Sequence, residues 1–237
     1  MANRFATSKS TERAFVSALR KVARVAGAIV HAQVNGSTLR DEAVMLRLLS
    51  AYAQSLTPWA EHISSRMVAS VSASNKRAFA RQAKQLHSAL AASTEMRTAQ
   101  LLQLRQVELI KSLPIEAGLR AQKLAQEAAI GGKRADEVAA ELLRTEDVTK
   151  SRAELIARTE VARANAAITQ ARAELVGATQ YIWQTAEDGD VRDSHAAMQG
   201  QAFSFNDPPE VDEGGAYNPG EIYNCRCFAE PILPDEN

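Results

Sequence analysis

The chain has 237 residues, 46% of them hydrophobic, which is enough to bury a core. No run of about 18 uncharged apolar residues occurs, so the sequence does not predict a transmembrane helix. The opening MANRFATSKSTERAF carries charges where a secretory signal has its apolar stretch, so it does not predict such a signal. We therefore expect a soluble protein made in the cytosol. In that compartment its two cysteines stay reduced and serve packing or metal binding rather than a structural disulfide.

The formal net charge is zero, but the charges divide at about residue 177. Residues 1–176 carry 26 Lys and Arg against 16 Asp and Glu, a net charge of +10, whereas residues 177–237 carry two Arg against 12 acids, a net charge of −10. The second part also holds six of the 11 glycines, five of the seven prolines and seven of the 12 aromatic residues. This shift in composition indicates a change of architecture.

The first part is alanine-rich and predicts a series of helices. In TERAFVSALRKVARVAGAIVHAQVNG, apolar residues recur at spacings of four, three, four and three, which predicts one buried helix face: Phe15, Leu19, Val22, Ala26 and Ile29. Four cations recur on another side of the same helix, and we call them the basic face: Lys9, Arg13, Arg20 and Arg24. A solvated surface is one interpretation of the basic face, and contact with an acidic partner or with DNA is the other.

Breaks between the later helices are expected at Gly36, at Thr57 acting as an N-cap before Pro58, at Pro114, and at Gly131 with Gly132. Ser151 with Glu154 forms a capping-box pattern, which predicts the start of a last helix there. Its buried face is expected to comprise Leu155, Ala162, Ala166, Thr169, Ala173 and Val176.

After Gly177 the apolar period changes. TQYIWQTA, QAFSF and NCRCFAEPIL are predicted as strands, and DVRDSHAAM is predicted as a short helix. The fold class is therefore α+β, with a mainly helical N-terminal region followed by a small α+β domain with a short antiparallel sheet. We place the boundary between residues 1–130 and residues 131–237.

Three segments in order, RTEVARANAAITQAR, YIWQTAEDGDVRDSHAAMQGQAF and NPGEIYNCRCFAEP, resemble the phage Mu F-like head morphogenesis family of minor capsid proteins. The resemblance covers about residues 130–233. The matching positions are Arg158, Thr159, Glu160, Trp183, Thr185, Asp188, Arg192, His195, Gly200, Pro219, Gly220, Asn224, Cys225 and Cys227.

The resemblance implies a minor head protein of a tailed bacteriophage or prophage, made in the host cytoplasm and then located in the head interior or at the portal vertex. Its partners would be the portal protein and the inner capsid, in several copies around the portal and without a membrane. Packaged DNA is a further candidate partner. The task implied is assembly and not catalysis.

The two cysteines are candidate metal ligands. If NCRCF is a strand, Cys225 and Cys227 point to one side and Arg226 to the other. With His195 they form a donor set that zinc prefers, and Asp188, Asp190, Asp193 or a water would be the fourth ligand. The alternative is that the thiols are buried apolar groups and His195 satisfies a hydrogen bond, and a redox pair ranks below both.

Arg192 and His195 lie one helical turn apart, with several carboxylates close in sequence. They are candidates for acid–base catalysis, but helix caps and ion pairs are the expected role, because no motif for a nucleophile or a phosphate loop accompanies them. Asp188 belongs to the same structural group.

The aromatic residues after Gly177 are expected either to pack in the core or to bind a partner. Trp183 is expected in the core, whereas Tyr217 and Tyr223 flank a glycine-rich loop and are candidates for either packing or partner binding. Arg158 and Glu160 are expected to pair with the acidic C-terminal part or to lie on a solvated surface.

Two other function classes remain open beside the head protein. The first is a DNA-binding assembly or genome-ejection protein that uses its basic helices. The second is a zinc-dependent or toxin-like enzyme built on the C-terminal domain, which should show a water-accessible cleft with Arg192 and His195 converging on it.

Overall fold

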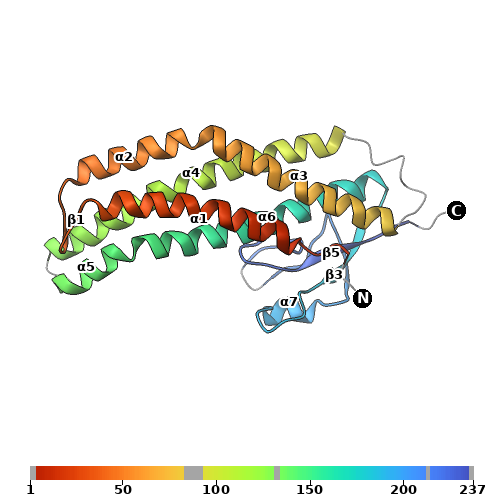
Figure 1. Cartoon of the computed structure of the whole chain (residues 1–237). Coiled ribbons are helices and arrows are strands. Elements are labelled where there is room, and N and C mark those ends of the chain that lie inside the picture. The colour runs from red at the N-terminus through yellow and green to blue at the C-terminus, as the bar shows by residue number, and fades with distance from the viewer. Residues whose placement is uncertain (1–3, 83–92, 131–133, 212–213, 235–237) are drawn as a thin grey trace. The chain divides into compact units, whose positions relative to one another are not determined.

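The computed structural model describes residues 4–82, 93–130, 134–211 and 214–234. Its elements, labelled in Figure 1, are α1 Lys9–His31, β1 Val34–Asn35, β2 Thr38–Leu39, α2 Glu42–Ser55, α3 Thr57–Gln82, α4 Ser93–Ala129, α5 Ala135–Leu143, α6 Thr145–Leu175, β3 Gln180–Gln184, α7 Asp193–Ala197, β4 Ala202–Ser204 and β5 Phe228–Ile232. The predicted fold class is confirmed, because helices dominate the N-terminal region and a small antiparallel sheet follows them. None of the described helices combines the length and the apolar character that a membrane crossing needs.

By contacts the chain divides into two compact units. Unit 1 comprises residues 1–13, 65–103 and 158–237, and unit 2 comprises residues 14–64 and 104–157. Four helices, α1, α3, α4 and α6, contribute residues to both units. The units are therefore discontinuous in sequence. The domain boundary expected after residue 130 does not coincide with the division between these units, and it stays a prediction.

Unit 2 is helical and includes the short hairpin of β1 and β2. Its core brings together parts of α1, α2, α4 and α5, with Ala26, Val30, Met45, Leu49, Ala117, Ala121, Leu124, Val138 and Leu142 buried. The predicted face of α1 is confirmed, since Phe15, Leu19, Val22 and Ala26 are buried and Ile29 packs against the core.

Small residues let the helices of unit 2 approach closely. A Cβ at Gly27 on α1 would lie 2.5 Å from Cβ of Glu146 on α6, so only glycine fits at this contact. A Cβ at Gly118 on α4 would meet the terminal methyl carbon Cδ1 of Leu49 at 2.8 Å, and that flexible side-chain end can rotate away.

Several helix boundaries differ from the sequence predictions. α4 continues through Pro114, although proline removes the amide hydrogen that would bond the carbonyl four residues earlier. α6 begins at Thr145, so Ser151 lies inside the helix and donates its hydroxyl hydrogen bond to the Asp147 carbonyl. The hydroxyl of Thr57 likewise donates to the Gln54 carbonyl and does not cap α3. The break expected at Gly131 and Gly132 lies outside the described residues.

Unit 1 contains the three-stranded sheet, in the order β4-β3-β5 with both pairings antiparallel. Tyr181 and Trp183 alternate with less buried residues along the central strand β3, so both rings enter the core. Opposite Tyr181 stand Phe203 on β4 and Pro231 on β5. β5 is an edge strand, where a proline costs no ladder hydrogen bond on its solvent side.

A polar network inside unit 1 joins α3 to α6. Arg172 on α6 is 1% exposed, and its guanidinium donates to the Ser72 carbonyl at 2.9 Å and to Oδ1 of Asn75 at 2.8 Å. The amide of Asn75 in turn donates to the hydroxyl of Thr169 at 2.7 Å. These bonds satisfy buried polar groups that would otherwise destabilise the fold.

Candidate functional site

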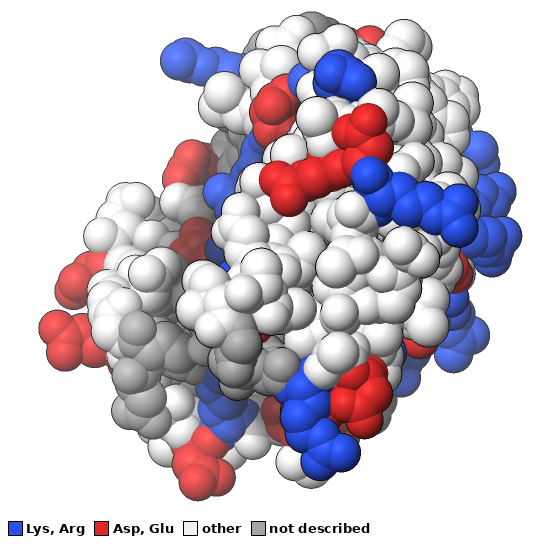
Figure 2. Space-filling view, turned by 90° about the vertical axis from the view of Figure 1, so that its left-hand side faces the viewer, with Lys and Arg blue, Asp and Glu red and all other residues white. Residues whose placement is uncertain are grey.

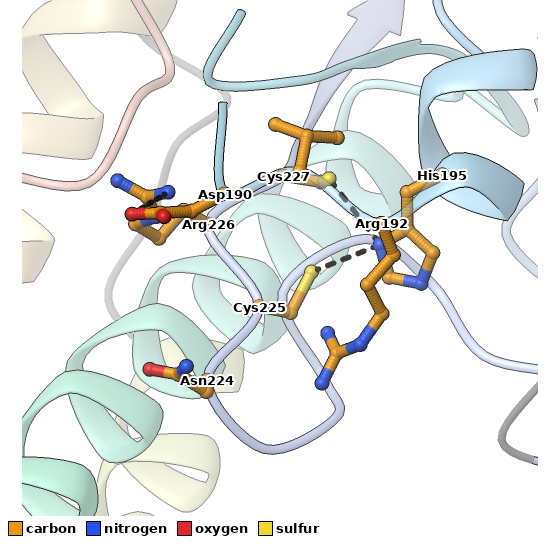
Figure 3. Close-up of a pocket in the computed structure, with 8 residues that line it drawn as sticks. Asp190, Arg192, His195, Asn224, Cys225, Arg226 and Cys227 are labelled. Atoms are coloured by element: carbon orange, nitrogen blue, oxygen red, sulfur yellow. Dashed lines mark hydrogen bonds and ion pairs between the residues drawn. The ribbon is translucent and has the colours of Figure 1, made fainter. Parts of the chain in front are cut away.

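Three soft metal-ligand side chains meet in unit 1, and we call them the Cys–His cluster: His195, Cys225 and Cys227. His195 comes from the short helix α7, and its Nδ1 lies 3.6 Å from Sγ of Cys225 and 3.5 Å from Sγ of Cys227 (Figure 3). All three side chains are buried, at 2%, 2% and 4% exposure respectively. The predicted proximity of these residues is confirmed, whereas their role as metal ligands stays a prediction.

The cysteines do not lie on a strand, which corrects the sequence prediction. β5 begins only at Phe228, and residues 225–227 form the irregular segment that leads into it. The expected alternation holds nevertheless: both thiols face His195, and Arg226 points away from it (Figure 3). The two thiols are therefore positioned between the preceding turn and the first paired residue of β5, Phe228.

Arg226 binds two of the acids that the sequence analysis named as candidate fourth zinc ligands, Asp188 and Asp190. Its guanidinium forms two hydrogen bonds of 2.6 Å to Asp188 and one of 3.1 Å to Asp190. Asp188 therefore has the structural role expected for it, as an ion-pair partner. Asp193, the remaining candidate acid, is exposed in the first turn of α7.

The turn before the cysteines is fastened to α6. Asn224 has a positive φ of 56°, its backbone N–H donates to the Thr159 hydroxyl at 3.0 Å, and its side-chain oxygen accepts from Arg158 at 2.9 Å. Asparagine tolerates this left-handed conformation better than most residues. The Arg-Thr part of the Arg-Thr-Glu segment thus positions the residue directly before Cys225.

A second fastening lies a few residues earlier. Gly220 has a φ of 92°, and a Cβ there would lie 3.2 Å from the Cys227 carbonyl and 3.3 Å from the Ala162 carbonyl. Next to it, Arg163 on α6 donates to the Glu221 carbonyl. Only glycine satisfies both the conformation and the close approach, so this position fixes the path of the chain over α6.

Arg158 and Glu160 each form an ion pair with another described residue of unit 1, and their expected pairing with the acidic C-terminal part stays a prediction. Arg158 pairs with Glu12 at 3.4 Å, and its contact in the C-terminal part is the neutral Asn224. Glu160 is 1% exposed and pairs with Arg163 on the same helix at 3.2 Å. α6 is buried on most of its sides in this region, which leaves Glu160 within reach of its own helical neighbours.

The aromatic residues around the Cys–His cluster have different environments. Trp183 is 1% exposed and meets the His195 ring edge to face at 5.3 Å, which confirms its place in the core. Tyr217 is half-buried and packs against the same core. Tyr223 is 56% exposed, and the Arg192 guanidinium lies 5.1 Å from its ring centre and donates to its carbonyl at 3.1 Å.

A small cavity opens beside the Cys–His cluster. It has a volume of about 10 Å³, which holds about one water molecule, and its lining includes Arg192 and Asn224 together with the three cluster residues. Arg192 and His195 both border this space, but it has no room for an organic substrate in the structure as it stands.

The two thiols share their acidity. The hydrogen bond from Cys227 holds the pKa of Cys225 below its ordinary value, and His195 acts in the same direction although burial opposes them. The same hydrogen bond raises the pKa of Cys227, and burial adds to the effect. The pair therefore loses its first proton readily and its second with difficulty.

The basic face of α1 is accessible. Lys9, Arg13, Arg20 and Arg24 are all exposed, and Arg20 forms an ion pair with Glu154 at 2.7 Å within unit 2. On the face drawn in Figure 2, blue and red side chains are interspersed around an uncharged area, and several blue side chains lie along the right-hand edge.

Sequence reasoning missed two positioning residues, Arg163 and Arg226. Arg226 was recognised only as the residue that points away from the thiols, and nothing in its neighbourhood identified Asp188 as its partner. Arg163 was not singled out, because its contact with the Glu221 carbonyl joins residues 58 positions apart.

Comparison with known proteins finds similarity over part of the chain. Residues 120–230 match the family described as Phage Mu protein F like protein. Over 127 residues the chain is 36% identical to an uncharacterized protein of Haemophilus influenzae, an alignment that covers 54% of this chain and 28% of that relative. No solved structure matches the chain. The resemblance to the phage Mu F-like family, which suggests a phage head-related protein, is confirmed over residues 120–230.

Proposed function

We propose that the protein is a minor head protein that acts in head morphogenesis of a tailed phage or prophage, in association with the portal. The family match over residues 120–230 carries this proposal. In this role the chain is made in the host cytoplasm and is then incorporated, in several copies, at the portal vertex or in the head interior. Its partners are the portal protein and the inner capsid.

The geometry of the site favours assembly over catalysis. Polar groups of the matching residues are bound within the protein: Arg158 and Thr159 hold Asn224, Asp188 holds Arg226, and Arg192 holds the Tyr223 carbonyl. The neighbouring cavity of about 10 Å³ accepts water or one ion. Such a site fixes a chain segment, whereas a zinc-dependent or toxin-like enzyme needs a cleft for its substrate.

DNA binding is the second candidate, and the basic face supports it. Its four cations are exposed, and residues 1–176 carry a net charge of +10, which attracts a polyanion as well as an acidic protein surface. The portal is preferred because the family match concerns head proteins and because acids are interspersed with the cations in Figure 2.

The test compares two partners for the full chain. Binding to the purified portal protein of the same phage or prophage and to duplex DNA is measured over a range of salt concentrations, and incorporation into heads is followed by mass spectrometry with cross-linking. The variant replaces Lys9, Arg13, Arg20 and Arg24 by glutamine. A control replaces four exposed cations of other helices, Arg47, Arg66, Lys76 and Lys123, which changes the net charge equally.

We expect the wild-type chain to bind the portal and cross-link to it in heads. The basic-face variant should bind more weakly and be incorporated less, while the control stays near wild type. If both variants lost the same amount of portal binding and incorporation, only the net charge, and not the position of the basic face, would matter. Binding to DNA alone, with a salt slope that falls by about 3.5 when the four cations are removed, would replace the head-assembly proposal by the DNA-binding one.

A further inference from the structure

We propose that the Cys–His cluster binds a zinc ion, with Cys225, Cys227 and His195 Nδ1 as three ligands and a water as the fourth. This inference goes beyond the role in head assembly and does not depend on it. Among the described residues, this is the one group of three or more His, Cys, Asp or Glu side chains whose ligand atoms gather closely enough to hold an ion.

The distances agree with tetrahedral zinc. Bond lengths of about 2.3 Å to sulfur and 2.0–2.1 Å to nitrogen, at tetrahedral angles, separate a nitrogen from a sulfur ligand by about 3.6 Å and two sulfurs by about 3.8 Å. The observed separations of Nδ1 from the two sulfurs are 3.6 and 3.5 Å, and all three ligand atoms lie within 4.8 Å of one another. Both nitrogen–sulfur separations therefore match those around a tetrahedral zinc ion.

Hydrogen bonding alone explains this arrangement less well. An imidazole nitrogen has one in-plane position, which either donates one hydrogen or accepts one. The two thiols bond to each other, yet both sulfurs lie 3.5 and 3.6 Å from the same Nδ1, and only one of them can use its single position. A metal ion placed between the three atoms satisfies all of them at once.

The ligand types favour zinc, and the neighbouring residues favour a water as its fourth ligand. Two thiolates and an imidazole are soft and borderline donors, which favour zinc over magnesium, calcium or manganese. The nearby acids Asp188 and Asp190 are engaged by Arg226 and do not compete. The cavity of about 10 Å³ that borders all three residues has room for the one water that completes the tetrahedron.

The site joins two segments that are also linked by the Arg192 bond to the Tyr223 carbonyl and by the Arg226–Asp188 ion pair. α7 has five residues and the cysteine segment is irregular, so neither holds its position through its own backbone hydrogen bonds. A zinc ion would tie α7 to the chain that enters β5, behind the Asn224 turn. Because its ligands come from two segments, the binding free energy of such an ion would add to the stability of their folded arrangement.

The first experiment measures metal in the full chain, purified under reducing conditions without a chelator. We expect about one zinc per chain by elemental analysis. The variant Cys225→Ser with Cys227→Ser should contain none, and His62→Ala, which removes an exposed histidine of α3, should keep it. Absence of zinc from the wild-type chain would overturn the proposal, as would equal zinc in the double-serine variant.

A second measurement covers the case in which the serine variant fails to fold. Cobalt(II) added to metal-free wild-type chain should produce the thiolate-to-cobalt charge-transfer band and the visible absorption of a tetrahedral site, and zinc should displace both. In parallel, alkylation of the thiols by N-ethylmaleimide should accelerate at least tenfold when a strong zinc chelator is added. A missing cobalt spectrum, or thiols that react equally slowly with and without chelator, would identify the cysteines as ordinary buried core residues.

Discussion

Replacing Thr159 by valine tests whether α6 holds the turn that precedes the cysteines. Thr159 is 5% exposed, and its hydroxyl accepts the Asn224 N–H at 3.0 Å. Valine keeps the shape of the side chain but leaves this amide without its acceptor. An unsatisfied, partly buried amide costs about 1–2 kcal/mol of unfolding free energy. For a protein of this size we expect the melting temperature to fall by about 2–8 °C.

The same helix provides a matched control. Thr149 is also 5% exposed, but its hydroxyl donates to the Thr145 carbonyl of its own helix at 2.7 Å. That carbonyl keeps its helical N–H partner when the hydroxyl is removed. Thr149→Val should therefore lower the melting temperature by less than about 2 °C, because it strands no buried donor.

The assay combines thermal unfolding with amide hydrogen exchange of Asn224. We expect Thr159→Val to lose protection at this amide, and Thr159→Ser, which restores the acceptor, to recover most of it. If the two valine variants have equal stability and the Asn224 amide stays protected in both, the hydroxyl does not hold the turn. The reasoning that connects α6 to the cysteines through this bond would then be wrong.

Three further substitutions test other close contacts. Gly220→Ala should lower the unfolding free energy by about 3 kcal/mol or more, because a Cβ there meets two carbonyl oxygens. The control Gly200→Ala, at a φ of 77° in open space, should cost only about 1–2 kcal/mol. Equal losses in thermal unfolding would contradict the close approach at Gly220. Gly27→Ala should destabilise by about 1–3 kcal/mol, and Gly118→Ala should be neutral or stabilising by up to about 1 kcal/mol, so the reverse order in urea unfolding would refute the packing argument. Asn75→Ala should cost about 2–3 kcal/mol by urea unfolding, since it removes one partner each from two buried side chains, and a loss under 1 kcal/mol would show that they find other partners.

The sequence predicts best what depends on local period. The apolar spacing from Phe15 to Ala26 identified the buried face of α1, and the change of period after Gly177 identified the strand β3 but not its central place in the sheet. Sequence patterns fail to predict a helix boundary when the same pattern fits both the start and the interior of a helix. Ser151 with Glu154 fits a capping box, yet α6 has already begun at Thr145 and the serine lies within it.

The Cys–His cluster was predictable in part, for a different reason. Two thiols two residues apart, with one histidine in the same part of the chain, leave few combinations of soft ligands, so residue type alone indicated the set. The fastening of the Asn224 turn to Thr159 was not predictable, because the bond joins residues 65 positions apart and no pattern in either segment requires it. The resemblance named both residues without assigning them to each other.

The matched region does not contain all of the core that supports its site. The residues packed around the sheet and the cysteines include Phe5, Ala78 and Phe79, which lie outside residues 120–230. Phe5 also accepts a hydrogen bond from the buried Asn165 of α6, and α3 supplies Asn75 to the Arg172 network. α6 therefore carries two sets of contacts: its Arg-Thr segment holds the turn before the cysteines, and its last turns bind α3 and the residues before α1. The residues before α1 and those of α3 therefore support the helix that holds the cysteine segment, and they do so from outside the matched region.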